Sequence, residues 1–328
     1  PSELSPNTSA YIKKMITHLF DKSEVAVFEG DAAVSTYLLE QRFDHIFFTG
    51  SPAIGKIVMR AASKYLSSVT LELGGKSPAI VGPEVNLAAS VQKIAWGKFL
   101  NNGQTCIAPD YVFVHEKVVF SFMEAMETTV QSFYNQDKKG IAKSVDYARI
   151  VNERHFNRII HLLQDATSKG AKIVFGGDFD EKDCFISPTL LSHCTPDMQI
   201  MQEEIFGPIL PMMTYTSESE IIDYLREEEK PLALYVFSTD DVFTEYILNN
   251  TTSGTSVVND CLIQFGHTEL PFGGVNHSGI GKSGGKYGFT EFSNQKSVVK
   301  QRTHLLKNFY PPYTFKSKWL IEQVLRWF

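Results

Sequence analysis

Short runs rich in Val, Ile and Phe alternate with segments of helical periodicity along the first part of this chain. The strand-like runs are EVAVFEG, HIFFTG and SVTLELGG, and between them lie DAAVSTYLLEQ and a helix that begins near Ile54. This order is typical of a parallel sheet with helices on its faces. Ligands of such folds bind beyond the carboxyl ends of the strands, so functional residues are expected where HIFFTG and SVTLELGG end.

The alternation restarts after GGKSPAIVGP and predicts a second α/β unit. A helix is expected from Leu87 to about Phe99 with Asn86 as its cap, and YVFVHE then reads as a strand. Apolar residues at helical spacing from Val119 to Phe133 predict a helix that packs on the core. A further helix is expected before the strand AKIVFGG. We therefore expect an α/β protein with a domain boundary near Gly75.

Composition excludes several classes of function. The 328 residues are 43% hydrophobic and carry a net charge of −6, without a basic stripe, which argues against nucleic acid as a partner. The His residues form no HxH or HExxH array, so no metal site is expected. No apolar run approaches the roughly 18 residues of a membrane span. The four cysteines show no CxxC pairing, which fits a reducing compartment, and the cytoplasm is the expected location.

Two side chains point to covalent chemistry. Glu72 ends the strand-like run VTLEL, and Cys106 follows a glycine in NNGQTC. A thiol attacks carbonyl carbon as the thiolate, and a nearby carboxylate can deprotonate it or activate the water that hydrolyses its acyl adduct. Considered alone, Cys106 is more simply a small buried apolar residue. Together with Glu72 it predicts covalent catalysis on a carbonyl group.

A glycine-bearing turn follows the second strand-like run. FFTGSPAIGK places Gly50 and Gly55 where a strand gives way to a helix. Glycines there permit close approach of the backbone, and a helix N-terminus presents free N–H groups to phosphate. The turn is not GxGxxG, and an ordinary connection is the simpler interpretation of it alone. Its position one helix before LELGGKSP strengthens the prediction of a nucleotide site.

The motifs FTGSPAIGK, LELGGKSP, GQTCIAP, EEIFGP and PFGGVNHSGIGKSGGKYGF occur in an order and spacing that resemble the aldehyde dehydrogenase superfamily. The resemblance covers essentially the whole chain, and GQTC, EEIFGP and PFGG are similar to the class 3 or fatty-aldehyde branch. It implies an aldehyde dehydrogenase-like fold, with a parallel-sheet cofactor domain and an α/β catalytic domain. Residues 1–75 would be the C-terminal part of the NAD(P)-binding domain, 76–291 the catalytic domain, and 292–328 an oligomerisation tail.

Carried over residue by residue, the resemblance makes Cys106 the catalytic thiol and Glu72 the general base. Glu204 of EEIFGP would hydrogen-bond the nicotinamide ribose, and Phe206 would pack beside the nicotinamide. Glu3 would bind the adenosine ribose, and a carboxylate there favours NAD over NADP because a 2′-phosphate would meet like charge. The complete set of implied cofactor residues is Glu3, Gly50, Ser51, Gly55, Leu73, Gly74, Glu204 and Phe206.

The implied reaction is the NAD(P)-dependent oxidation of an aldehyde to its acid. Cys106 would form a thiohemiacetal, hydride would pass to NAD, and Glu72 would activate the water that cleaves the resulting thioester. The substrate is expected to be hydrophobic, long-chain or aromatic, and the enzyme a homo-oligomer. The chain opens with PSELSP, and by the resemblance the family's oxyanion-stabilising Asn belongs to sequence before Pro1, so an N-terminally truncated chain is expected, one that on its own is expected to be inactive.

Two rival functions remain open. Cys106, Glu72 and Lys76 together are also the residue types of amide- and nitrile-hydrolysing enzymes, which need no nucleotide. The second rival is an inactive homologue that acts through its C-terminal segment, which combines basic residues with an apolar set: Trp319, Leu320, Leu325, Trp327 and Phe328. Such a segment can contact an anionic membrane surface, although docking on the same protein or a partner subunit is favoured.

Overall fold

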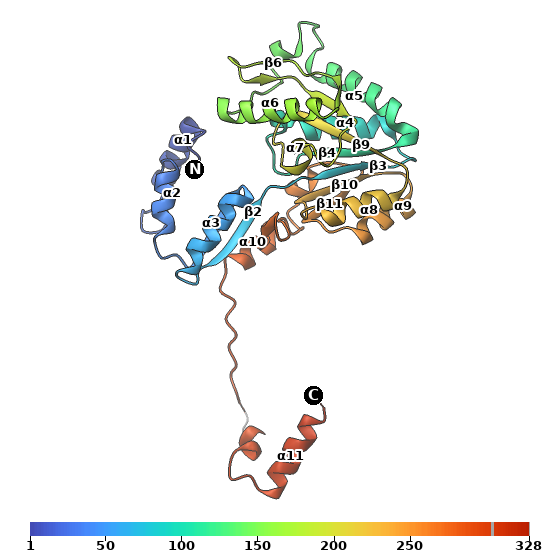
Figure 1. Ribbon diagram of the computed structural model, residues 1–328. Helices are drawn as coiled ribbons and strands as arrows, with labels where there is room; N and C mark the ends of the chain where they lie inside the picture. The colour runs from blue at the N-terminus through green and yellow to red at the C-terminus, as the bar shows by residue number, and fades with distance from the viewer. Residues whose placement is uncertain (303–304, 328) are drawn as a thin grey trace. The chain divides into compact units, whose positions relative to one another are not determined.

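The computed structural model describes residues 1–302 and 305–327, and its chain forms two compact units, Pro1–Phe292 and Ser293–Phe328 (Figure 1). The first contains a seven-stranded sheet, a three-stranded sheet and a two-stranded pair, and the predicted boundary near Gly75 lies in the link between the two larger sheets. Because these two sheets belong to one compact unit, the predicted division into residues 1–75 and 76–291 stays a prediction.

The larger sheet has seven strands in the order β11-β10-β3-β4-β9-β8-β5. All neighbouring strands are parallel except β5 and β8, which are antiparallel. Crossover helices connect the parallel strands, as the alternating pattern predicted. The strands are β3 (Pro78–Val81), β4 (Tyr111–His115), β5 (Lys172–Phe175), β8 (Thr189–Ser192), β9 (Ile209–Tyr215), β10 (Ala233–Phe237) and β11 (Thr255–Val258).

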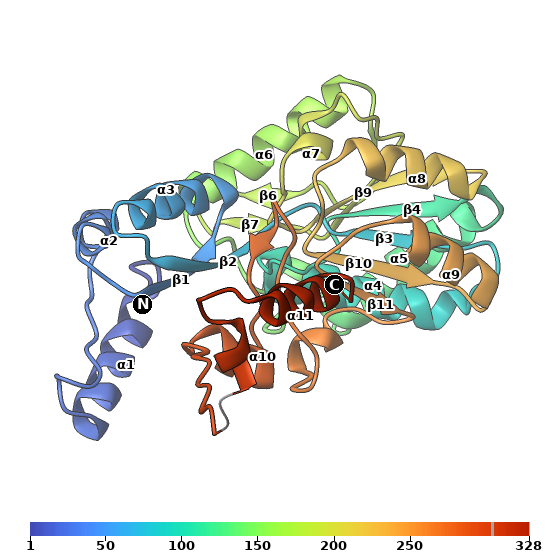
Figure 2. The same cartoon turned by 90° about the horizontal axis from the view of Figure 1, so that it is seen from below.

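Helices cover both faces of this sheet, and successive strand residues face opposite clusters of core side chains. In β4, Val112 and Val114 join one apolar cluster, whereas Tyr111 and Phe113 join the other. Such strands are buried on both faces, which explains their continuous apolar runs. Helices α4 (Leu87–Phe99) and α5 (Val119–Tyr134) supply the first cluster, and α6 (Glu153–Ser168), α8 (Glu218–Glu227) and α9 (Asp241–Asn250) supply the second. Figures 1 and 2 show α5 and α8 on opposite sides of the strands.

The smaller sheet has the order β1-β2-β12, with β1 (His45–Gly50) parallel to β2 (Ser68–Leu73) and β12 (Gly279–Ile280) antiparallel to β2. Helix α3 (Pro52–Ser63) connects β1 to β2, and its Val58 packs against Leu71 and Leu73 of β2. The other helices of this region are α1 (Pro6–Leu19), α2 (Ala32–Leu39) and α10 (Gly285–Glu291). This sheet brings the carboxyl ends of β1 and β2 to the same edge.

Most predicted elements are confirmed. Asn86 caps α4 by accepting a hydrogen bond from the Ala89 amide at 3.3 Å. The predicted strand EVAVFEG is wrong, because residue 24 lies in a turn and residues 25–30 have no regular secondary structure and form no ladder with any segment that the structure describes. A strand needs a hydrogen-bonded neighbour, and β1 finds its own in β2. The remaining short elements are η1 (Leu100–Gly103), η2 (Glu116–Val118), η3 (Ile141–Lys143), β6 (Phe179–Asp180), β7 (Phe185–Ile186), α7 (Gln199–Gln202) and η4 (Ile263–Gly266).

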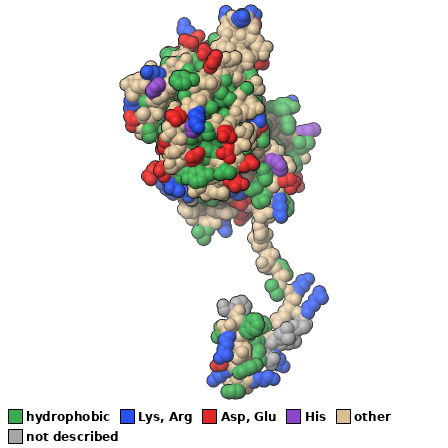
Figure 3. All heavy atoms as spheres, turned by 90° about the vertical axis from the view of Figure 1, so that its right-hand side faces the viewer, with side chains coloured by type: hydrophobic (Ala, Val, Ile, Leu, Met, Phe, Trp, Pro, Cys, Tyr) green, Lys and Arg blue, Asp and Glu red, His purple; other side chains and the backbone are tan. Residues whose placement is uncertain are grey.

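The second unit contains a 3-10 turn η5 (Leu305–Phe309) and helix α11 (Phe315–Leu325). Thr314 caps α11 by accepting from the Ser317 amide at 3.3 Å. Trp319 and Leu325 of the predicted apolar set are exposed, as is Trp327 beyond the helix, whereas Leu320 is half-buried and Phe328 lies outside the described residues. Figure 3 shows hydrophobic side chains beside Lys and Arg on one face of this unit. Its predicted docking or membrane role stays a prediction.

Candidate active site

Cys106 lies in a tight turn between α4 and β4. The chain leaves α4 through Asn101, Asn102 and Gly103, whose φ angles are 49°, 60° and 73°, and Ala108 N–H closes the turn on the Thr105 carbonyl at 3.0 Å. Side chains hold this turn in place: Gln104 donates to the Arg149 carbonyl at 2.9 Å and accepts from the Val151 amide at 3.0 Å. The thiol is therefore carried on a segment that is fixed at both ends.

The turn packs directly against the EEIFGP segment. A Cβ added to Gly103 would stand 2.3 Å from the Gly207 carbonyl oxygen, so no side chain fits at this contact. Arg158 of α6 fixes the same segment by donating to the carbonyl oxygens of Glu204 at 3.0 Å and Ile205 at 2.5 Å. The Cys106 turn (residues 101–108) and the EEIFGP segment (residues 203–208) are distant in sequence, and together they form one wall of the site.

Glu72 lies at the carboxyl end of β2 and is 9% exposed. Burial raises the pKa of its carboxyl group, because a charge is less stable away from water. A hydrogen bond from the Ser283 hydroxyl and the positive charge of Lys282 oppose this rise. The net effect is a pKa above the ordinary value of a glutamate, which makes this carboxylate a stronger base.

The half-buried thiol of Cys106 is under the influence of two carboxylates. Its pKa is raised to about 11, first by burial, then by the charge of Glu204 and then by that of Glu72. Such electrostatic influence requires proximity, so the fold brings together the predicted nucleophile and the predicted base. At neutral pH this thiol is protonated, and a base must remove its proton before it attacks a carbonyl carbon.

Glu204 is held against the backbone that follows Glu72. An added Cβ on Gly74 would meet its carboxylate oxygen at 2.1 Å, and the Gly75 N–H donates a hydrogen bond to the same carboxylate. Burial, and next the charge of Asp110, raise the pKa of Glu204 to about 8. The backbone at Gly74 and Gly75 and the carboxylate of Glu204 therefore lie in direct contact, and their predicted binding of a cofactor stays a prediction.

Asp110, Lys76 and Lys98 form a buried group of charges next to the EEIFGP segment. Asp110 forms an ion pair with Lys76, and its other oxygen accepts from the Ile205 amide at 3.0 Å. Lys76 also donates to the carbonyl oxygens of Ile200 at 2.8 Å and Glu203 at 3.1 Å. Lys98 is 1% exposed, and burial lowers its pKa to about 8, while Asp110 opposes that decrease. The Lys76 ammonium is therefore held by Asp110 and two backbone carbonyl groups. This structural role weakens the hydrolase alternative, in which Lys76 would be catalytic.

The glycine turn occupies the carboxyl end of β1. Ser51 caps α3, and an added Cβ on Gly55 would stand 2.7 Å from the Leu73 side chain, so the helix packs closely on β2. A cavity of about 280 Å³ borders Gly55, Leu73 and Pro52. A close-packed helix N-terminus beside a cavity fits the phosphates of a dinucleotide. Gly50 ends β1 immediately before this cap.

Phe206 and Glu3, two of the predicted cofactor residues, are exposed. Phe206 is 37% exposed and has a φ of 46°, which turns the EEIFGP segment at the wall beside Cys106. Glu3 lies in an exposed turn before α1, and among the described residues no hydrogen bond or ion pair connects it with the glycine turn. Its predicted contact with the adenosine ribose stays a prediction.

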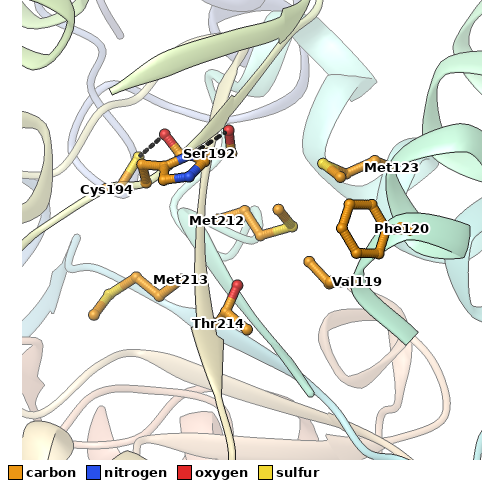
Figure 4. A pocket seen from close by; sticks show the side chains of 9 residues that line it. Val119, Phe120, Met123, Ser192, Cys194, Met212, Met213 and Thr214 are labelled. Carbon is orange, nitrogen blue, oxygen red and sulfur yellow. Dashed lines mark hydrogen bonds between the residues drawn. The ribbon is translucent and has the colours of Figure 1, made fainter. Parts of the chain in front are cut away.

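A second cavity, of about 330 Å³, lies between the N-terminal end of α5 and the ends of β8 and β9 (Figure 4). Met212 points toward Met123 and Phe120 in this view. This cavity is at the carboxyl edge of the larger sheet, whereas Cys106 precedes the amino end of β4 in the same parallel sheet. The two are therefore separate features.

Within residues 1–302 and 305–327, no three His, Cys, Asp or Glu side chains converge as metal ligands would. The helices of that same part of the chain include none with the length and apolarity needed to cross a bilayer.

The aldehyde dehydrogenase family model matches residues 1–298, and the chain belongs to this family. It is 46% identical over 321 residues to the 4,4'-diaponeurosporen-aldehyde dehydrogenase of Staphylococcus aureus, covering 98% of this chain and 69% of that one. It is 45% identical over 299 residues to aldehyde dehydrogenase family 3 member A2 of Mus musculus, covering 91% and 60%. The predicted resemblance to the class 3 or fatty-aldehyde branch is confirmed.

A third relative is the dimeric NADP-preferring aldehyde dehydrogenase of Mus musculus, 42% identical over 299 residues, which cover 91% of this chain and 64% of that one. Among solved structures, the substrate-bound state of Staphylococcus aureus AldH superposes with a TM-score of 0.92 at 45% identity, covering 99% of this chain and 70% of that chain. The predicted fold class is confirmed, and the chain is an oxidoreductase of a family that uses NAD or NADP. This chain spans between 60% and 70% of these relatives.

Sequence reasoning missed the groups that support the site. Lys98 and Asp110 carry charge inside apolar runs, and a charged residue within such a run is the signal that could have identified them. Ser283 and Lys282 lie within the quoted PFGGVNHSGIGKSGGKYGF motif, but nothing in that motif indicates that they contact Glu72. Only the pairing of β12 with β2 does so.

Proposed function

We propose that this protein oxidises an aldehyde to the carboxylic acid with Cys106 as nucleophile and Glu72 as general base. The observation that carries the proposal is that the Cys106 turn packs on the segment of Glu204, whose carboxylate in turn lies against Gly74 at the strand end that carries Glu72. A carboxylate beside the thiol serves to remove its proton, and Glu72 deprotonates the water of the later hydrolytic step. Neither step needs a metal ion.

NAD is the proposed cofactor, with NADP as the alternative that a relative's name raises. The residues that would hold it are the glycine turn with Ser51, the backbone of Leu73 and Gly74, and Glu204 with Phe206. Glu3 is the proposed partner of the adenosine ribose. When bound, NAD(P) supplies the oxidant that converts the aldehyde to the oxidation level of an acid.

The residues of this chain perform the remaining steps. The Cys106 sulfur bonds to the aldehyde carbon to give a thiohemiacetal, and the backbone N–H of Cys106 would donate a hydrogen bond to the developing oxyanion. At the acyl stage, Glu72 takes a proton from water as the water oxygen bonds to the acyl carbon. The bond from that carbon to Cys106 then breaks and releases the acid.

A hydrophobic aldehyde, long-chain or aromatic, is the proposed substrate class. The relative named for 4,4'-diaponeurosporen-aldehyde and the similarity to the fatty-aldehyde branch support it. A homodimer is the proposed assembly, since one relative is named as dimeric. The cytoplasm is the proposed location, because the four cysteines form no CxxC pair. The exposed Trp319 and Trp327 beside Lys316 and Lys318 support contact of the tail with a membrane surface or a partner.

The test is NAD(P)H formation at 340 nm by the protein at its full native length, with short, long and aromatic aldehydes. Cys106→Ser and Glu72→Gln should each abolish aldehyde-dependent reduction in steady state, whereas Ser132→Ala, an exposed change on α5, should not. Reduction that survives Cys106→Ser, or that no aldehyde elicits with either cofactor, would overturn the proposal. Hydrolysis of amides without nucleotide would then favour the hydrolase.

A further inference from the structure

Ser283 contacts the proposed general base across the smaller sheet. The pairing of β12 with β2 places Gly279 opposite Glu72, and the chain then turns at Gly281, whose φ is 80°. This turn brings the Ser283 hydroxyl to the Oε1 atom of Glu72, to which it donates a hydrogen bond. In the described part of the chain, no other protein group donates a hydrogen bond to this carboxylate.

Ser283 is itself fixed. Its amide donates to the Phe272 carbonyl at 2.6 Å, and its carbonyl accepts from the Phe272 amide at 2.9 Å. Phe272 is 5% exposed and belongs to the core of the larger sheet. The segment that follows is also anchored to β2, because Thr70 donates to the Glu291 carboxylate at 2.7 Å. The hydroxyl therefore has a defined position relative to Glu72.

Lys282 supplies the opposite charge. Its ammonium donates to the carbonyl oxygens of Gly273 at 2.6 Å and Gly274 at 3.0 Å, with Gly254 at 3.5 Å. Burial lowers the pKa of Lys282, and the nearby charge of Glu72 opposes that decrease. The three carbonyl groups hold the ammonium in place without neutralising it.

Other titratable groups near Glu72 lie on neighbouring elements. Cys106, in the turn before β4, is close enough for the charge of Glu72 to raise its pKa. His45 of β1 and Glu291 of α10 both bond to Thr70, two residues earlier on β2. Lys282 is the cation among them whose charge acts on Glu72.

We propose that Ser283 and Lys282 are positioning residues for Glu72, the hydroxyl fixing one carboxylate oxygen and the ammonium stabilising its charged form, so that the second oxygen faces the hydrolytic water. This inference rests on the proposed function, since it assigns the geometry of its last step. In that step the second oxygen takes one proton from water, the water oxygen bonds to the acyl carbon, and the carbon–sulfur bond breaks. The proton passes from Glu72 to the departing thiolate, which restores both groups.

The pair acts on hydrolysis of the acyl-enzyme and not on its formation. Ser283→Ala should therefore leave a rapid burst of NAD(P)H of about one per active site, while the steady-state rate falls roughly tenfold, the effect of losing one hydrogen bond to a charged group. The KM for the aldehyde should be unchanged. The lower-pH limb of kcat should move to higher pH, because the Ser283 hydrogen bond lowers the pKa of Glu72.

Matched variants separate positioning from simple loss of structure. Ser283→Thr retains the hydroxyl and should restore the steady-state rate. Lys282→Met should move the pH limb in the same direction as Ser283→Ala, and Lys282→Arg should restore it. Ser132→Ala, the same substitution at an exposed position of α5, should match the wild-type protein. Equal kcat, burst and pH limb in Ser283→Ala and wild type would overturn the inference and leave the proposed function intact.

A measurement independent of turnover covers the case in which no aldehyde is oxidised. The δ-carboxyl of Glu72, labelled with ¹³C and assigned by its loss in Glu72→Gln, is titrated by NMR. Its titration should move to higher pH in Ser283→Ala and in Lys282→Met. A titration that neither substitution moves would overturn the inference, whereas the absence of NAD(P)H with every aldehyde would overturn the proposed function alone.

Discussion

The carboxylate of Glu204 lies over the α-carbon of Gly74, so close that an added Cβ would stand 2.1 Å from its oxygen. Gly74 is buried, and the amide of the next residue, Gly75, donates to this carboxylate. The strand end that carries Glu72 thus also places Glu204. One short backbone segment sets the position of both acids that act on Cys106.

Gly74→Ala should therefore displace the Glu204 carboxylate. The clashing atoms are at the end of a flexible side chain, so the carboxylate can move aside and the expected loss of stability is small. If Glu204 binds the cofactor, the KM for NAD(P) should rise about tenfold, as expected for the loss of one charge-assisted hydrogen bond. Initial-rate kinetics at saturating aldehyde measure it, with Glu204→Gln as the comparison. An unchanged KM in both variants would remove Glu204 from the cofactor site.

Alkylation of Cys106 should depend strongly on pH. Because its pKa is about 11, the rate with iodoacetamide should rise about tenfold per pH unit between pH 7 and 10 in the protein without cofactor. Glu204 is charged mainly above its own pKa of about 8, and this charge raises the pKa of Cys106. Glu204→Gln should therefore accelerate alkylation roughly threefold above pH 8 and have little effect below it. A Cys106 rate that is already maximal at pH 8 would contradict this electrostatic description.

The raised pKa of Glu204 should also make the stability of the protein depend on pH. Its folded-state pKa of about 8 lies above the ordinary 4.5, so its contribution to stability is fully present below pH 4.5 and is lost as the pH rises through about 8. Glu204→Gln has no carboxyl group at this position and does not lose stability in this way. The difference in melting temperature, variant minus wild type, should therefore be a few degrees larger at pH 9 than at pH 5. Thermal unfolding at the two pH values measures the difference. Glu203→Gln, at the exposed neighbouring position, should show no such trend.

Much of the fold could be predicted because its signals are local. The Asn86 cap and the helical spacing from Val119 predicted α4 and α5, and the position of Cys106 in a turn followed from the motif that contains it. The hydrogen bond between Ser283 and Glu72 could not be predicted, since it connects residues 211 positions apart through the pairing of a two-residue strand. EVAVFEG has the composition of a strand but lacks a partner, and composition alone does not reveal the partner.

Asp110 illustrates the same limit within the site. Its carboxylate bonds to Lys76 and to the Ile205 amide, so it connects the strand end after Glu72 with the segment that carries Glu204. The sequence shows an acid before a strand, which by itself is most simply a turn residue. Only the fold shows that it is 4% exposed and paired.

Lys76→Met tests whether this buried ion pair maintains the site. The substitution leaves the Asp110 carboxylate buried without its cation and removes two donors from the Ile200 and Glu203 carbonyls. Breaking such a pair costs about 3 kcal/mol, and the loosened segment should also weaken cofactor binding. Urea unfolding measures the stability, and the KM for NAD(P) measures the site.

Lys64→Met is the matched control, because Lys64 pairs with Glu40 at 2.8 Å with both side chains more than half exposed. Exposed pairs are screened by water and salt, so this variant should unfold at almost the wild-type urea concentration. The double variant Lys76→Met, Asp110→Asn should recover part of the stability, since the uncompensated charge is removed. If Lys76→Met unfolds at the same urea concentration as Lys64→Met, the ion pair contributes no more than a surface contact and another interaction holds the EEIFGP segment against the thiol.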